Sequence, residues 1–395
     1  MRSNQKLQHG LSLVELMIAL AIGLFLMLGA TQIFLASLRN QGLNEEIARR
    51  QERIRLVKEW LSHDLRQLGY LGCGTRNKQF ANSSDGVDLG FSVTNMTDRS
   101  DPGARLIGVT GVDGDNLPSS LGNDLSGTDN WQPGDAPDGY PLPDIVTLSS
   151  VQPGLRILGN DITSSANLRV VAADSSRQCS GTGNANSSAP SGLCEGDLLI
   201  AADCDQAVLF VGTNITTTNG CGSGITSCTQ VVHSRANTGG TGNTASVWQK
   251  QVERFGSGAE LIRVGAVTYF VGLSELNDEP ALMRCELPCT ARSQWEELVP
   301  GVENLQVWYR LDDDDRFLRA DEIVDTSDWQ RVSALRIRGV LRSASTSAEQ
   351  ARLAFNGDSC ESPMASGSPT DLLEFTDGRL RTNFCFSVAL RNRLN

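Results

Sequence analysis

Residues 11–30 read LSLVELMIALAIGLFLMLGA, and every side chain in this stretch is apolar or small except Ser12 and Glu15. A helix rises 1.5 Å per residue, so about twenty residues span roughly 30 Å, the thickness of a bilayer's hydrocarbon core. Residues 1–10, MRSNQKLQHG, contain Arg2 and Lys6 and no acidic residue. Basic residues ahead of a span keep the amino terminus in the cytoplasm. The stretch therefore predicts a helix that crosses the membrane and sends the remainder of the chain across.

Three interpretations of this segment compete. A secretory signal has its small-residue cleavage site after the apolar run and rarely holds a carboxylate within it. A plain membrane anchor leaves the leader attached and has no need for Glu15. In the third interpretation the chain is cut between Gly10 and Leu11, and the apolar run becomes the new amino terminus.

The sequence GLSLVEL, residues 10–16, resembles the processing site of type IV prepilins, in which a Gly precedes the cut and a Glu is fifth in the mature chain. The resemblance implies that a prepilin peptidase cleaves after Gly10 and N-methylates Leu11. It is specific because leader, Gly, Glu and apolar span occur together in one order, and it favours the third interpretation.

The presence of Glu15 inside the apolar span requires an explanation, because placing a carboxylate in hydrocarbon costs on the order of 2–3 kcal/mol. One reason is its place in the first helical turn, where the positive end of the helix dipole offsets part of that cost. The other is pairing with the free amino group of Leu11 on a neighbouring subunit. We favour the second, since an ionisable residue inside a membrane is a functional candidate by default.

The helical pattern continues beyond the span. Apolar residues recur at three- and four-residue spacing and form one stripe: Ile54, Val57, Leu61, Leu65 and Leu68. No Pro occurs before Pro102, so one helix is expected from residue 11 to about residue 68, ended by Gly69, Gly72 and Gly74. The expected organisation is a leader at 1–10, a transmembrane or filament-core helix at 11–38, its amphipathic continuation at 39–72, and a disulfide-containing β-rich head at 73–395.

Strand signals dominate the head. Short apolar runs are expected as strands at 145–148, 168–172, 197–202 and 207–211. Apolar and polar residues alternate at 305–311, 335–342 and 384–391, which predicts a sheet covered on one side only. The amphipathic half of the helix is the expected cover. The fold class is α+β, with a long helix on an antiparallel sheet and room for a second sheet beyond it.

Two polar regions interrupt these strands. Residues 75–143 are rich in Asn, Asp, Ser, Gly and Pro and are expected to form long loops with one or two strands. Residues 212–243 are rich in Ser, Thr, Gly and Asn and are expected to form a stapled surface loop, because Cys221 and Cys228 lie within them.

The chain has ten cysteines, an even number that suits an oxidising compartment with disulfides. They are Cys73, Cys179, Cys194, Cys204, Cys221, Cys228, Cys285, Cys289, Cys360 and Cys385. No C-x-x-C pair occurs, so a zinc site lacks a clear set of four ligands. The connectivity is open, although Cys285–Cys289 and Cys221–Cys228 are the closest pairs in sequence.

Three segments of the head resemble PilW-type minor pilins: GDLLIAADC at 196–204, PGVENLQVWY at 300–309, and the ending FCFSVALRNR at 384–393. These proteins are similar in role to the J-type pseudopilins of type II secretion. The resemblance implies a pilin-like head and a subunit near the filament tip that helps start assembly. It also implies contact with the prepilin peptidase, other minor pilins, the major pilin and a tip adhesin.

The sequence offers little for catalysis. His63 and His233 follow the leader without the companions of a triad, and each is expected to be an ordinary surface residue. The net charge of −12 argues against nucleic-acid binding. We expect no enzyme activity and no cofactor.

One acidic cluster is a weak calcium candidate, with Asp312, Asp314, Asp315 and Glu322 as ligands and Asp313 and Asp321 beside them. Arg316 occupies the place where a calcium loop usually turns at a Gly, which favours a solvated acidic turn.

The expected role is therefore a structural subunit, anchored in the inner membrane of a Gram-negative-type cell with a periplasmic head, and later part of a surface pilus. The alternatives are a minor pseudopilin of type II secretion and a binding module at the tip that acts through its disulfide-held loops.

Overall fold

The computed structural model describes residues 13–68, 108–114, 140–151, 154–158, 167–174, 177, 179, 190–202, 207–219, 221, 225–233, 258–276, 279–286, 292–324, 328–329, 331–346, 351–354 and 372–390. The chain divides into two compact units, residues 1–53 and 54–395. The first unit is helical where it is described, and the second contains every described strand.

The first element is α1 (Leu13–Gln67), one helix of 55 residues. It confirms the long helix predicted for residues 11 to about 68; the glycines predicted to end it lie outside the described residues. By length and composition α1 could cross a membrane, because its most apolar window has a mean hydropathy of 2.4.

The largest sheet of the second unit has eight strands, and all of its described pairings are antiparallel. Its main path runs β1 (Val109–Val112), β2 (Ile145–Val151), β9 (Glu260–Leu273), β10 (Pro280–Glu286) and β11 (Glu296–Pro300). The first part of β9 also pairs with β3 (Leu155–Arg156) and β5 (Leu198–Ala202), and β5 pairs with β6 (Ala207–Val211). The strand β9 is therefore shared by two parts of the head.

A second antiparallel sheet has the order β12 (Val302–Leu311), β13 (Val332–Thr346) and β16 (Arg379–Ala389). Beside it lie β14 (Ala351–Ala354) and β15 (Leu372–Phe375), which pair with each other. A third group has the order β4 (Asn167–Val171), β8 (Cys228–Val232) and β7 (Asn214–Thr218). Two short 3-10 turns complete the described elements, Pro190–Gly192 and Arg292–Gln294.

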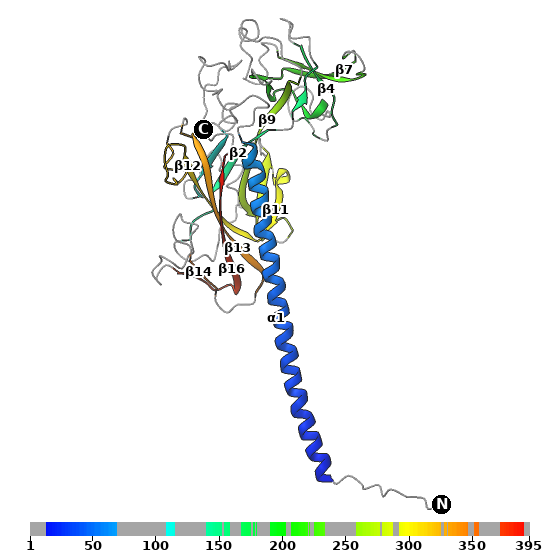
Figure 1. Ribbon diagram of the computed structural model, residues 1–395, viewed down its shortest axis with the longest axis vertical. Helices are drawn as coiled ribbons and strands as arrows, with labels where there is room; N and C mark the ends of the chain where they lie inside the picture. The colour runs from blue at the N-terminus through cyan, green and yellow to red at the C-terminus, as the bar shows by residue number, and fades with distance from the viewer. Residues whose placement is uncertain are drawn as a thin grey trace, which may run out of the picture. The chain divides into compact units, whose positions relative to one another are not determined.

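The main core forms where α1 meets the first two sheets (Figure 1). Val57, Leu61, Leu65 and Leu68 are each at most 1% exposed, and they pack with residues of both sheets. Ile54 packs against the same cluster. Burial of this stripe confirms the amphipathic part of the helix as the cover of the sheet, and each buried Leu or Val adds roughly 1.5–3 kcal/mol of hydrophobic stabilisation.

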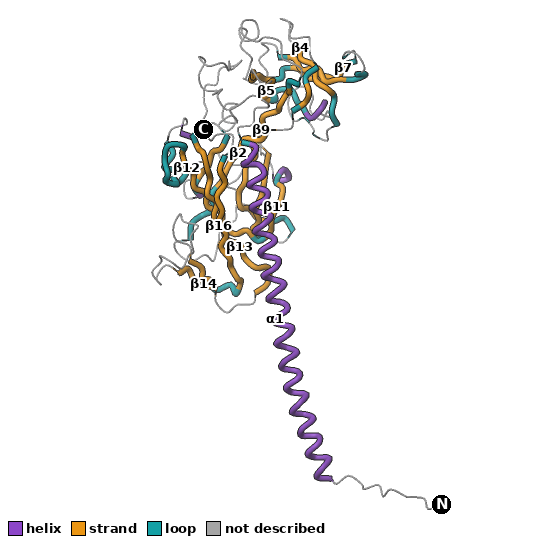
Figure 2. The backbone as a smooth tube through the Cα atoms, viewed as in Figure 1, coloured by secondary structure: helices purple, strands orange, loops and turns teal. Residues whose placement is uncertain are grey.

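A smaller core lies among β4–β8 and the start of β9, with Val170, Leu199, Phe210 and Val231 fully buried. In Figure 2 the strands β4, β5 and β7 gather in one group, separate from β12, β13 and β16. We call this part, residues 154–264, the second lobe.

The strands expected from alternation and apolar runs are all present as β2, β4, β5, β6, β12, β13 and β16. The expectation that the alternating sheet is covered on one side only is wrong. On the polar side of the alternation Gln306 is 3% exposed and Arg338 is 4% exposed. The physical reason is that residues 140–144 lie over this side of β12. Their backbone oxygens accept hydrogen bonds from the side chains of Asn304 and Gln306.

The surface loop predicted for 212–243 is wrong in part. Residues 214–218 and 228–232 form β7 and β8, an antiparallel hairpin. The Ser, Thr and Asn residues that suggested a loop alternate with buried Ile215 and Val231, so the hairpin has one buried face and one polar face.

Candidate functional site

The first candidate site is the amino-terminal part of α1. Gly10 and Leu11 lie outside the described residues, and Glu15 lies in the first turn of the helix. Large apolar side chains are exposed all around the helix in the first unit, at Leu13, Val14, Leu16, Met17, Ile18, Leu20, Ile22, Leu24, Phe25, Leu26, Met27, Leu28, Ile33, Phe34, Leu35 and Leu38. An apolar surface of this extent needs lipid or other helices to cover it.

The second feature is a polar contact that fixes the helix in the head. The Tyr269 hydroxyl on β9 donates a hydrogen bond of 2.6 Å to Asp64 Oδ2 on α1. Arg284 on β10 lies 3.5 Å from the same oxygen and 3.3 Å from Glu296 of β11. Burial and the neighbouring Asp64 raise the pKa of Tyr269, so the hydroxyl keeps its proton and stays a donor.

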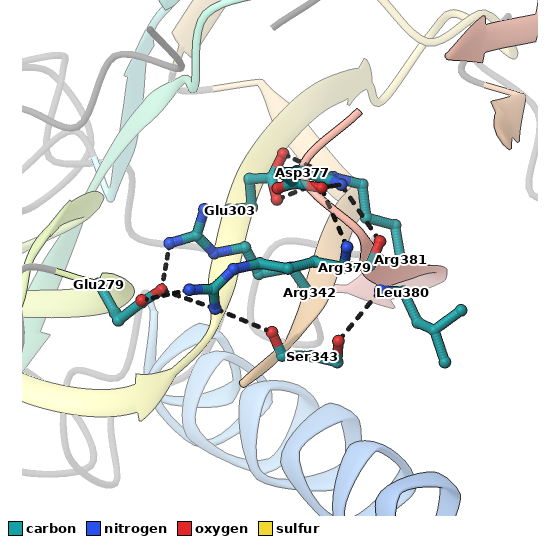
Figure 3. A network of polar contacts seen from close by, with 8 residues as sticks. All are labelled: Glu279, Glu303, Arg342, Ser343, Asp377, Arg379, Leu380 and Arg381. Atoms are coloured by element: carbon teal, nitrogen blue, oxygen red, sulfur yellow. Dashed lines mark hydrogen bonds and ion pairs between the residues drawn. The ribbon is translucent and has the colours of Figure 1, made fainter. Parts of the chain in front are cut away.

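The third feature is a network of buried and half-buried charges at the start of β12 and β16 (Figure 3). Glu303 has no exposed surface, and both of its carboxylate oxygens lie 3.0 Å from Nε of Arg381. Arg381 also forms two hydrogen bonds of 2.8 Å with Asp377. Burial raises the pKa of Glu303 although Arg381 acts in the opposite direction.

The same network reaches the β9–β10 turn through Glu279. Its carboxylate pairs with Arg342 and with Arg379, whose Nη2 lies 2.7 Å from Oε1. Arg379 also donates to the backbone oxygen of Ser343. These arginines and carboxylates pair with one another, so the cluster joins β13 and β16 to the first sheet.

The fourth feature is a pair of buried carboxylates that share one arginine. Nη2 of Arg319 lies 2.9 Å from Asp113 and 3.0 Å from Asp144. Asp144 is 1% exposed and Asp113 is 4% exposed. Burial raises the pKa of Asp144 to about 7, against the opposing effect of Arg319 and of two backbone N–H donors. Burial likewise raises the pKa of Asp113.

The acidic turn pairs with arginines. Arg331 contacts Asp312, at 3.2 Å, and Asp313. Arg316 forms a forked contact with Asp314, with distances of 2.9 and 3.1 Å to Oδ2. The hydrogen bonds from these arginines lower the pKa of Asp313 and of Asp314.

Of the other calcium candidates, Glu322 accepts a hydrogen bond from the backbone N–H of Arg319, and Asp315 is exposed. Within the described ranges no group of three His, Cys, Asp or Glu side chains could hold a metal ion. The calcium site stays a prediction, and the arginine pairing favours the solvated acidic turn.

The two histidines differ. His63 is exposed on α1 beside Gln67, as expected. For His233 the expectation of a surface position is wrong, because the residue is 9% exposed and its ring meets Phe210 edge to face, with ring centroids 5.6 Å apart. Burial lowers the pKa of His233 to about 4, so the ring is neutral near pH 7 and packs as part of the second lobe.

Two disulfides are described, and both lie in the second lobe. Cys221–Cys228 closes the β7–β8 hairpin and confirms that predicted pair. Cys179–Cys194 was not among the predicted pairs. Cys285 and Cys385 are also disulfide-bonded, and none of the described cysteines is free. The predicted Cys285–Cys289 pair includes Cys289, which lies outside the described residues, as do Cys73, Cys204 and Cys360.

Gly196 and Asp197, which begin the GDLLIAADC segment, stabilise a turn. Gly196 adopts a φ of +90°, a conformation that favours glycine. Asp197 Oδ2 accepts the backbone N–H of Cys194 at 2.7 Å, and both carboxylate oxygens bind Arg177. This pair therefore holds the turn that precedes β5 next to the Cys179–Cys194 disulfide.

Comparison with known proteins finds two family matches. Residues 5–31 match the prokaryotic N-terminal methylation motif, and residues 268–392 match the family of type IV pilus-assembly protein W. No curated protein and no solved structure matches the chain. The second match begins within β9 and covers β10 to β16, so the second lobe precedes it. With its long apolar helix and antiparallel sheets, the chain is a prepilin-like pilin of the PilW type, related to the type IV pilus.

Proposed function

We propose that this pilin is a non-catalytic minor subunit that is incorporated near the tip of a type IV pilus and helps to start its assembly. The observation that carries the proposal is the exposed apolar part of α1, which keeps Glu15 in its first turn. The match of residues 5–31 to the methylation motif and the name of the matched assembly family support it.

The proposed maturation begins with cleavage after Gly10 and methylation of Leu11 by a prepilin peptidase. The proposed parts are then the leader at 1–10, the transmembrane or filament-core helix at 11–38, its continuation at 39–72 and the head at 73–395. Glu15 pairs with the amino group of Leu11 on a neighbouring subunit, so both charges are neutralised as the subunit leaves the bilayer.

The proposed location is the inner membrane, with the head in the periplasm before assembly and on the cell surface afterwards. Disulfides in the second lobe support an oxidising compartment. The proposed partners are the prepilin peptidase, other minor pilins, the major pilin and a tip adhesin, without nucleic acid.

A structural role rather than an enzymatic one is supported by the polar groups of the described head. The buried charged clusters of Asp144 and Glu303 are engaged with arginines and backbone groups, as ion pairs that stabilise a fold are. Described His63 and His233 lie apart from a triad geometry, one exposed on the helix and one packed on Phe210.

A second candidate function is an adhesive module at the tip. The second lobe favours it, since this lobe has its own core and two disulfides and precedes the matched family segment. A minor pseudopilin of type II secretion is the remaining alternative for the filament.

The test of the main proposal is the variant Gly10→Val, followed by the mass and membrane partition of the product. Blocked processing leaves the leader attached, so the mature product should be heavier by residues 1–10 and should stay out of the filament. Ser3→Val, in the same leader, is the matched control and should mature normally. An unchanged mature mass for Gly10→Val would overturn the proposal.

A further inference from the structure

The strand β12 lies at one end of its sheet, and two other segments close its outer side. The backbone oxygen of Leu305 accepts the N–H of Asp144 at 2.7 Å, and the N–H of Val307 donates to Asp144 Oδ2 at 2.8 Å. Farther along, Tyr309 and Leu318 exchange two backbone hydrogen bonds of 2.8 Å. Without these segments the outer groups of β12 would be open to pairing with another chain.

The segment at residues 140–144, here called the strap, is also held by side chains of β12. Asn304 Nδ2 donates to the backbone oxygen of Pro141 at 2.6 Å. Gln306 Nε2 donates to the backbone oxygen of Leu142, also at 2.6 Å. The strap therefore contacts β12 from Asn304 to Val307, and Asp144 supplies both the backbone and the carboxylate contacts at one end.

The Asp144 end of the strap carries an excess of buried negative charge. Asp144 and Asp113 both bind the single guanidinium of Arg319, which lies 5.2 Å from the ring of Trp308. Gly114 N–H also donates to Asp144 at 3.1 Å. When both carboxylates are ionised, one arginine balances two negative charges in a buried site, which is unfavourable.

A further negative charge, that of Asp321, also disfavours ionisation of Asp113. Asp321 adds negative charge next to Asp113 and donates its backbone N–H to that carboxylate at 2.9 Å. Glu322 accepts the backbone N–H of Arg319. At the other end of the strap, Tyr140 lies near buried Glu303 and near Arg381, which pairs with Glu303. Protonation of a carboxylate is thus the way to relieve the charge at the Asp144 end.

We propose that the strap is a pH-sensitive cover for the edge of β12, firmly closed when Asp144 is protonated and loosened when Asp144 is ionised. Loosening exposes the outer backbone groups of Leu305 and Val307 to solvent.

The direction of the effect follows from proton binding. Burial raises the pKa of Asp144 to about 7 in the closed state, whereas an open, solvated carboxyl has its ordinary value near 3.8. Between these two values the closed state binds more protons, so closure weakens as pH rises from about 4 to about 7. At pH values above this window Asp144 stays ionised and the strap stays loosened.

Hydrogen–deuterium exchange of the full-length chain in detergent micelles tests the proposal at about pH 5 and about pH 8. Rates are corrected for the intrinsic effect of pH on amide exchange. A peptide covering residues 305–307 should lose about tenfold or more of its protection at the higher pH. A peptide from β10, which the strap does not cover, serves as the internal reference.

The variant Asp144→Asn should abolish the pH-dependent loss of exchange protection at residues 305–307, because an asparagine side chain cannot ionise. Asp315→Asn is the matched control, since it removes an exposed carboxylate from the nearby acidic turn, and it should behave as the wild type. If Asp144→Asn does not fold, Asp113→Asn gives the same test. In that variant one arginine balances one carboxylate, so the loss of exchange protection at the higher pH should be smaller than in the wild type. A wild-type chain without the loss, or a full loss in a folded variant at Asp144 or Asp113, overturns the proposal.

Discussion

The Tyr269 hydroxyl on β9 donates a hydrogen bond of 2.6 Å to the Asp64 carboxylate, and this contact joins the carboxyl-terminal end of α1 to the first sheet. Asp64 stands beside the apolar stripe, between Leu61 and Leu65, which are buried in the core. Hydrophobic burial has no preferred direction, whereas a hydrogen bond has one. The pair therefore adds a directional contact to the apolar packing of residues 54–67 of α1 against the sheets.

Replacing Tyr269 with Phe should reduce the free energy of unfolding of the head by about 1–2 kcal/mol, because the nearly buried Asp64 loses its hydroxyl donor. The double variant Tyr269→Phe with Asp64→Leu should recover part of this loss, since no buried charge then lacks a donor. Thermal unfolding in detergent measures both changes. Equal stability of Tyr269→Phe and the wild type would show that the pair has no effect on helix docking.

Gly111 on β1 leaves space for the Tyr309 side chain. A Cβ at this position would lie 1.9 Å from the Tyr309 hydroxyl oxygen and 2.6 Å from Cζ. Gly111→Ala should therefore destabilise the head by about 1–3 kcal/mol, because a buried aromatic ring has little room to move. Gly42→Ala is the control: nothing lies within 4 Å of its Cβ on α1, so it should be neutral or more stable by up to about 1 kcal/mol. Equal effects of the two variants would contradict the role of Gly111.

The helix and the alternating strands could be predicted because their signals are local. The stripe from Ile54 to Leu68 repeats with the helical period, and the strand at β12 repeats with a period of two. The central strand β9 was missed. Its sequence ELIRVGAVTYFVGL is a nearly continuous apolar run, and residues 261–272 are all buried. A strand covered on both faces has no alternation to detect.

The buried charges could not be predicted, because each depends on partners far away in the chain. Asp144 and Arg319 are 175 residues apart in sequence, and Glu303 and Arg381 are 78 apart. The alternation of β12 correctly separates its two faces, but it cannot show that residues 140–144 cover the polar one. The Cys221–Cys228 disulfide was predictable because its loop is short, whereas Cys179–Cys194 was not the closest choice.

The double variant Cys221→Ser with Cys228→Ser tests the role of the hairpin disulfide. The disulfide joins residues seven apart, so the unfolded chain gains entropy on its removal and the second lobe should lose roughly 2–3 kcal/mol. Hydrogen exchange should become faster in β7 and β8 and stay unchanged in β12 and β13, which belong to the main core. Uniform acceleration through the head would contradict a separately stabilised second lobe.

Arg381 neutralises Glu303, which has no exposed surface (Figure 3). Arg381→Leu should cost about 3–5 kcal/mol, because it leaves a buried charge without its partner. This loss of stability should be larger at about pH 8 than at about pH 5. Burial already raises the pKa of Glu303, removal of Arg381 raises it further, and a folded-state pKa above the unfolded value means that stability falls as pH rises.

The double variant Glu303→Leu with Arg381→Leu is the control for this charge effect. It removes both charges, so it should recover much of the lost stability and all of the added pH dependence. Thermal unfolding at the two pH values measures this. If Arg381→Leu loses the same stability at both values, its effect comes from lost packing, such as its 3.7 Å contact with Phe375, rather than from charge.

Glu15 gives the most direct test of the proposed assembly step. Glu15→Gln keeps the size of the side chain and removes its charge, so membrane insertion and cleavage should be unchanged. In the filament, the amino group of Leu11 on a neighbouring subunit would then lack its partner, at a cost on the order of 2–3 kcal/mol in an apolar surrounding. Since 1.4 kcal/mol corresponds to a factor of ten, incorporation into filaments should fall by about tenfold or more. Glu45→Gln, an exposed position farther along α1, should be incorporated normally. Measured amounts of each variant in sheared filaments and in membranes decide the matter, and normal incorporation of Glu15→Gln would mean that the carboxylate serves the helix dipole alone.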